Sequence, residues 1–310
     1  MKILVAGISL NNNLIHLPAQ KICEEIIKLF PRIVNRACDC LGEEAVVMIV
    51  LYEYALTKWA ITKEEKDDCL KILSNAIKPY PQVILIPGSF AFYQEFAHDS
   101  AKMQKIRKTY QVLTGISDIK MDREFSCEKI NLLENLMHES PTQIKCLANT
   151  TYIMQHNKVT QHRKCFPWQE RERLGMVKGH SIFNIGPGAL LKKIDLQGES
   201  IDVGILICRE LVPSEMISNV LKASPLFQIA ISNFIGNEPH KFHGALNIHM
   251  DKKDKLTVFV NTQHVRINSI EQVLAVHYTK GAFEAYDECE IVQVQDRETL
   301  LAEKTMICSP

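Results

Sequence analysis

One short apolar segment followed by a cysteine constrains the fold more than any other part of this sequence. Residues 203–207 read Val-Gly-Ile-Leu-Ile, and Cys208 and two charged residues follow at once. An unbroken apolar run of this length is typical of a strand covered on both faces, as in the sheets of α/β proteins. In open α/β sheets the carboxyl ends of the strands carry the chemistry. Cys208 is therefore either a core thiol, which is common for free cysteines, or a reactive residue at a strand end.

The first third of the chain alternates between predicted strands and predicted helices. Apolar runs at residues 1–8, 45–52 and 82–86 predict buried strands, and the second of them ends at Glu53. A helical stripe over residues 20–41 contains Pro31, which predicts a kink or break, and a capping box at residues 62–65 predicts a helix to about residue 78. This alternation predicts an α/β layer architecture.

The rest of the chain has shorter predicted elements and no clear linker. Two hairpins are expected, one over residues 146–166 and one over residues 194–207. The segment 98–143 is more polar and predicts helical or irregular structure, with 128–137 as its best helical stretch. Further expected elements are helices at 213–222 and 242–253 and strands at 226–232, 256–261, 273–278 and 289–294. A single domain over residues 1–310 is therefore expected.

Composition excludes several classes of function. The 310 residues are 46% hydrophobic, and 36 basic residues balance 36 acidic ones without a long run of either sign. We therefore expect no nucleic-acid partner and no membrane partner, and a small molecule fits better. The ten cysteines include no C-x-x-C pair and no secretory signal precedes them, so reduced thiols and a cytoplasmic location are expected.

Two further residues could activate a thiol at position 208. A nucleophilic thiol needs a base, and the oxyanion that its attack creates needs a cation or N–H donor. Glu53 could be that base, because burial at a strand end favours the protonated carboxyl; it could equally be a solvated loop residue. Lys164 precedes Phe-Pro-Trp, aromatic surroundings that favour burial, although an exposed basic pair on a hairpin is the alternative.

The order Glu, Lys, Cys at these strand ends resembles the nitrilase, or carbon-nitrogen hydrolase, superfamily. The resemblance extends from the first strand to about residue 261, and its strongest parts are Gly204, Ile207, Cys208 and Glu210, together with Asn149-Thr150-Thr151 leading to Arg163-Lys164. The run Arg163-Lys164, Pro167-Trp168 and Glu172 is similar to the aliphatic amidase branch.

This resemblance implies a four-layer α-β-β-α sandwich and a catalytic triad. Cys208 would be the nucleophile, Glu53 the general base and later acid, Lys164 the oxyanion stabiliser and Glu172 a supporting glutamate. The implied reaction is hydrolysis of an amide, nitrile or carbamoyl compound through a cysteine thioester, with no metal or organic cofactor. The family commonly pairs through its outer helices, so a homodimer or higher homo-oligomer is expected.

The sequence also departs from the family pattern. Tyr52 replaces the usual proline before the glutamate, Glu210 replaces a frequent aspartate, and Val212 replaces a frequent arginine. A carboxylate-bearing substrate held by that arginine is not supported, and substrate identity stays open.

Three alternatives remain at this point. A catalytically idle protein of the same fold could bind a small molecule or a protein partner. A Cys/His hydrolase of another fold is possible, since the chain has 11 histidines. A metalloenzyme could use His240, His243 and His249, although their spacing lacks the His-Glu-x-x-His pattern and exposed helix histidines explain them better.

Overall fold

A computed structural model describes most of the chain. The described residues are 2–10, 16–106, 108, 141–165, 181–186, 191–211, 225, 227–233, 246–252, 255–260, 274–279, 282–285, 289–292 and 301–308. The predicted helices at 128–137 and 213–222 lie outside these residues.

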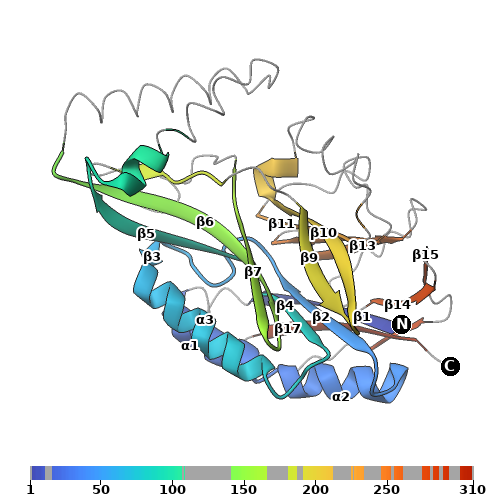
Figure 1. The fold of residues 1–310 in the computed structure, drawn as a ribbon. Coiled ribbons are helices and arrows are strands. Elements are labelled where there is room, and N and C mark those ends of the chain that lie inside the picture. The colour runs from blue at the N-terminus through green and yellow to red at the C-terminus, as the bar shows by residue number, and fades with distance from the viewer. Residues whose placement is uncertain are drawn as a thin grey trace.

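The larger of two sheets is mixed and runs across the middle of the molecule (Figure 1). Its main path is β15-β14-β1-β2-β4-β6-β5-β3, with β7 and β8 paired to β6, and β17 paired to β1 and β16. Its centre, β1-β2-β4, is parallel, as expected for strands with near-continuous apolar runs. The strands are β1 (Lys2–Leu10), β2 (Val46–Leu51), β3 (Ile61–Thr62), β4 (Val83–Ile86), β5 (Ser89–Ala97), β6 (Gln143–Gln155), β7 (Lys158–Arg163), β8 (Ser181–Phe183), β14 (Leu274–Thr279), β15 (Ala282–Ala285), β16 (Cys289–Val292) and β17 (Leu301–Cys308).

The smaller sheet carries the strand that leads to Cys208. Its order is β13-β12-β11-β10-β9, and β10, β11 and β12 are parallel. The strands are β9 (Leu191–Leu196), β10 (Glu199–Ile207), β11 (Phe227–Ser232), β12 (Leu246–Asp251) and β13 (Lys255–Val260), and β10 continues into the 3₁₀ helix η2 (Cys208–Leu211). Both predicted hairpins are confirmed, as β6–β7 and β9–β10.

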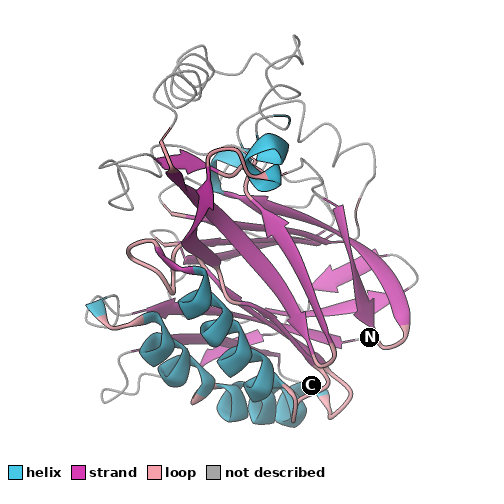
Figure 2. Ribbon diagram, turned by 60° about the vertical axis from the view of Figure 1, so that its left-hand side comes forward, coloured by secondary structure: helices cyan, strands magenta, loops and turns pink. Residues whose placement is uncertain are grey.

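Three helices cover the outer face of the larger sheet, as Figures 1 and 2 show: α1 (Ala19–Ile27), α2 (Phe30–Leu41) and α3 (Lys63–Ile77). The predicted break near Pro31 is confirmed, and this proline occupies the first turn of α2, where a missing N–H leaves no helical hydrogen bond unmade. The predicted capping box is also present: Thr62 accepts from the backbone of Glu65, whose side chain accepts from the backbone of Thr62. None of the described helices is both long and apolar enough to cross a bilayer.

The two sheets stack face to face and share one hydrophobic core. They approach closely at Gly7 of β1, where an added Cβ would lie 2.9 Å from the Leu256 Cβ and 3.0 Å from the Met250 sulfur. A larger side chain at position 7 would push the sheets apart. The described residues thus form helices, a large sheet and a second sheet in successive layers, which confirms the expected α/β fold class.

The predicted helix at 242–253 is wrong, because residues 246–251 form strand β12. This strand lies between β11 and β13, and its polar residues Asn247, His249 and Asp251 are nearly as buried as the apolar Ile248 and Met250 between them. Alternation with period two was the correct pattern, and the burial of its polar members, two of which bond Ser232 of β11, is not revealed by the local sequence. Strand β5 was not predicted at all.

Gly88 packs closely against the backbone of Tyr52, the residue before Glu53, and a substitution at Gly88 tests this close approach. Its φ is +74°, and an added Cβ would lie 2.2 Å from the carbonyl oxygen of Tyr52. Gly198 has a similar φ of +86°, but its added Cβ would meet nothing within 4 Å. We expect Gly198→Ala to cost about 1 kcal/mol for the left-handed backbone, and Gly88→Ala about 3 kcal/mol or more, because steric overlap adds to that cost. Urea unfolding measures both, and equal losses would contradict the close approach.

Candidate active site

The structure brings Glu53, Lys164 and Cys208 together at the ends of three strands. Glu53 follows β2, Lys164 follows β7, and Cys208 follows β10 in the opposite sheet. Glu53 and Lys164 are each 1% exposed, and Cys208 is 6% exposed. The sheets are joined here by the backbone, since the Glu53 N–H donates to the Ser232 carbonyl over 3.3 Å.

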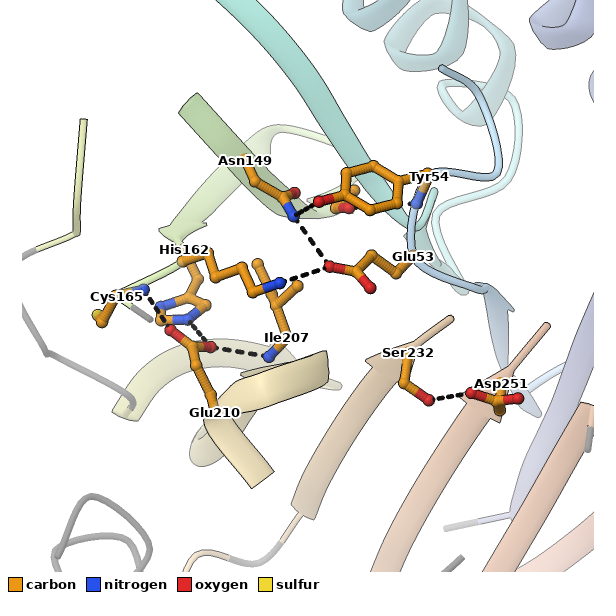
Figure 3. Close-up of polar contacts among 11 residues, drawn as sticks. Glu53, Tyr54, Asn149, His162, Cys165, Ile207, Glu210, Ser232 and Asp251 are labelled. Carbon is orange, nitrogen blue, oxygen red and sulfur yellow. Dashed lines mark hydrogen bonds and ion pairs between the residues drawn. The ribbon is translucent and has the colours of Figure 1, made fainter. Parts of the chain in front are cut away.

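The Glu53 carboxylate accepts hydrogen bonds from both a charged and a polar side chain. The Lys164 Nζ donates to the Glu53 Oε1 over 2.8 Å. The Asn149 Nδ2 donates to the same oxygen over 3.0 Å (Figure 3). Asn149 Nδ2 also lies 3.0 Å from the hydroxyl oxygen of Tyr54. A buried ammonium and carboxylate in contact satisfy the requirement that buried charges be paired. The base and the cation predicted from the sequence are therefore one ion pair.

The backbone at Cys208 exposes its thiol to this pair. Cys208 has a φ of +49°, an uncommon conformation for a residue with a side chain, at the turn from β10 into η2. Such strain at a strand end is typical of functional sites. The negative charge of Glu53 and the backbone N–H of Asn233 both act on the pKa of this thiol, so both groups lie near it.

Burial, reinforced by the negative charge of Glu53, raises the pKa of Cys208 to about 12. Lys164 and the Asn233 N–H act in the opposite direction but do not outweigh it. The Cys208 thiol is therefore protonated at neutral pH, beside a carboxylate. A reaction at this sulfur would therefore require general-base activation by the carboxylate, because no thiolate is preformed.

Glu210 joins the Lys164 segment to the Cys208 turn. One carboxylate oxygen accepts from the Cys165 N–H over 2.5 Å; the other lies 2.8 Å from His162 Nε2 and accepts from the Ile207 N–H over 2.7 Å (Figure 3). Burial alone would raise the pKa of Glu210, but His162 and these two N–H groups lower it below its ordinary value. Glu210 is thus an ionised positioning residue, a role that the sequence did not reveal because His162 lies 48 positions away.

A second polar cluster supports the same edge of the smaller sheet. Ser232 lies 2.7 Å from His249 Nε2 and donates to Asp251. All three residues are fully buried, and burial lowers the pKa of His249, which keeps it neutral. The cluster fixes the end of β11, whose Ser232 carbonyl accepts from Glu53.

These positions also answer the metal alternative in part. An exposed helix residue was expected at His249. The structure instead places it on a strand, where it is buried and lies within hydrogen-bond distance of Ser232. His240 and His243 lie outside the described residues, as does Glu172, whose supporting role stays a prediction. Within the described ranges, no group of three or more His, Cys, Asp or Glu side chains could hold a metal ion.

The proximity of Glu53 predicts how the thiol responds when that charge is removed. In Glu53→Gln the thiolate no longer faces a carboxylate, and it neutralises the Lys164 ammonium, so the pKa of Cys208 should fall. The pH midpoint of Cys208 alkylation by iodoacetamide, followed by peptide mapping, should therefore shift to lower pH. Cys146, whose pKa burial also raises to about 12, is the internal control and should not change. An unchanged or higher midpoint for Cys208 would contradict the contact.

Comparisons with known proteins support the fold. No protein-family model matches the sequence, and no curated protein matches it. Among solved structures, Saccharomyces cerevisiae Nit3, a member of branch 10 of the nitrilase superfamily, is 13% identical with a TM-score of 0.50, covering 92% of this chain and 89% of its own. A cysteine-to-serine mutant of the Nesterenkonia AN1 amidase, from the same superfamily, is 11% identical with a TM-score of 0.51, covering 91% and 92%.

A third similar structure is larger than this chain. Glutamine-dependent NAD+ synthetase from Acinetobacter baumannii is 8% identical with a TM-score of 0.50, and the match covers 94% of this chain but 48% of that one. Identities this low speak for the fold alone. The layers, the two sheets and these likenesses together show that this chain has the nitrilase-like α/β fold.

Proposed function

We propose that this protein hydrolyses a carbon–nitrogen bond of a small amide, nitrile or carbamoyl compound through a cysteine thioester. The observation that carries the proposal is the convergence of a buried Lys164–Glu53 ion pair on the Cys208 thiol. A nucleophile, a base in contact with it and a cation beside both are the groups that acyl transfer requires. The nitrilase-like fold supports the reaction class and leaves the substrate open.

For an amide, the first half of the reaction forms the thioester. The Cys208 sulfur attacks the carbonyl carbon while the thiol proton passes to Glu53, and the Lys164 ammonium stabilises the oxyanion. The tetrahedral intermediate collapses as Glu53 gives that proton to the leaving nitrogen. The C–N bond breaks, and ammonia or an amine departs.

The second half restores the thiol. Glu53 accepts a proton from water as the water oxygen attacks the thioester carbon, and Lys164 again faces the oxyanion. Collapse of this intermediate breaks the C–S bond, releases the acid and returns the proton to the Cys208 sulfur. Every proton is moved by Glu53, which is why its contact with the thiol matters.

A panel of short amides, nitriles and N-carbamoyl compounds tests the proposal directly. The full chain is incubated with each compound, and release of ammonia is measured. We expect turnover of at least one class. No release across the panel would contradict the proposal and favour a catalytically idle protein that binds a small molecule or a protein partner.

The homodimer stays a prediction, for which light scattering at micromolar concentration is the measurement.

A further inference from the structure

A positively charged cavity lies away from the catalytic residues. Its volume is about 280 Å³, and it is bounded by the segment at residues 102–106, strands β7 and β9, and residues 184–185 after β8. Its polar lining among the described residues consists of four cations and two amides: Lys102, Lys105, Arg163, Lys192, Gln161 and Asn184. No acidic side chain of the described residues lines it.

The cavity is distinct from the thiol site because neighbouring residues of an extended chain point to opposite sides. Lys164 points to Glu53, whereas Arg163, one residue earlier, points into the cavity. None of the three catalytic candidates is among its lining residues. What binds here is therefore a question separate from the proposed hydrolysis.

Three of the four cations have no carboxylate partner among the described residues. Within the described part of the chain, no ion pair is formed by Lys102, Arg163 or Lys192. Arg163 is the most buried of them, and its Nε is shielded from solvent without a hydrogen-bond partner. Burial lowers the pKa of both Arg163 and Lys192, so their positive charge is poorly solvated. Buried charges in folded proteins are normally compensated by an opposite charge.

The amides present donors to the same space. Arg163 Nη1 donates to Asn184 Oδ1 over 3.1 Å, which fixes the amide so that its Nδ2 is left as a donor. Asn184 is only 7% exposed and is positioned by its own backbone bond to Leu147. A lining of guanidinium, ammonium and amide donors is matched by a ligand that carries only acceptors and several negative charges.

We propose that this cavity binds a small phosphorylated molecule carrying at least two negative charges. Phosphate oxygens are acceptors only, and their tetrahedral arrangement can meet donors from the several directions that these elements supply. The volume exceeds that of a single phosphate and suits pyrophosphate or a phosphate ester of a small organic group.

Calorimetric titration of the full chain with pyrophosphate at fixed ionic strength tests the site. We expect Lys192→Gln and Lys102→Gln each to weaken binding about tenfold, since each removes one charge-assisted contact. Lys193→Gln is the matched control: it is the next residue of β9, it is exposed, and it lies 3.6 Å from Asp202. The control should bind pyrophosphate as the unaltered chain does.

Each outcome decides the matter. Binding that both cavity variants weaken and the control preserves supports the site. Absence of pyrophosphate binding, or equal weakening by Lys193→Gln, overturns it. A parallel titration with citrate separates phosphate from carboxylate recognition, and tighter binding of citrate would overturn the phosphate assignment. All three variants keep the catalytic residues, so ammonia release reports independently on the proposed hydrolysis.

Discussion

Replacing Cys208 with alanine is expected to abolish turnover of every substrate that the unaltered protein accepts. In the proposed reaction Cys208 is the nucleophile of the covalent step, while Glu53 moves a proton and Lys164 stabilises an oxyanion, so neither can take its place. The fold should survive, since the exchange removes one sulfur atom and costs about 1 kcal/mol of unfolding free energy. The measurements are ammonia release and urea unfolding on the same preparation.

Cys146→Ala is the matched control for this experiment. Cys146 is similarly buried, and burial raises its pKa to about 12, as it does for Cys208. It lies on β6 and contacts Met103, away from the ion pair. The control should keep its activity. Turnover that persists in Cys208→Ala would show that another group is the nucleophile.

Lys164→Met should impair both catalysis and stability. Loss of an oxyanion donor typically costs about 10²- to 10³-fold in kcat, and we expect a loss of at least that size. The same change leaves the Glu53 carboxylate in a buried site without the ammonium 2.8 Å away. Removing one partner of a buried ion pair costs about 3–5 kcal/mol of unfolding free energy. Steady-state kinetics and urea unfolding measure the two effects separately.

A double variant distinguishes these two roles. In Lys164→Met with Glu53→Gln no uncompensated charge remains, so most of the lost stability should return while activity stays lost. The Asn149 amide, which donates to Glu53, can still bond the new glutamine oxygen. If the double variant were no more stable than Lys164→Met alone, the ion pair would not be the source of the stability loss.

Local sequence patterns predicted much of the fold because strands and helices here follow their own periodicity. The apolar run of β2 and the capping box of α3 each depend on residues close together in the chain. Strand β12 was wrongly predicted as a helix because its polar residues are buried and two of them bond Ser232 of β11, which the segment itself does not encode. The pattern within a segment indicates which of its apolar residues are buried, but it does not identify the distant residues that pack against the segment.

The candidate site divides in the same way. The sequence, through the apolar strand ends and the resemblance they carry, determined that Glu53, Lys164 and Cys208 belong together. Only the tertiary structure decided the contacts around them. Asn149 donates to Glu53, which is 96 residues away in the sequence, and Glu210 lies within hydrogen-bond distance of His162, which is 48 residues away. The separate cavity lined by cations from several elements emerged at this level too. Hydrogen bonds and charges between distant strands depend on how the sheets stack, and no short pattern in the chain records that.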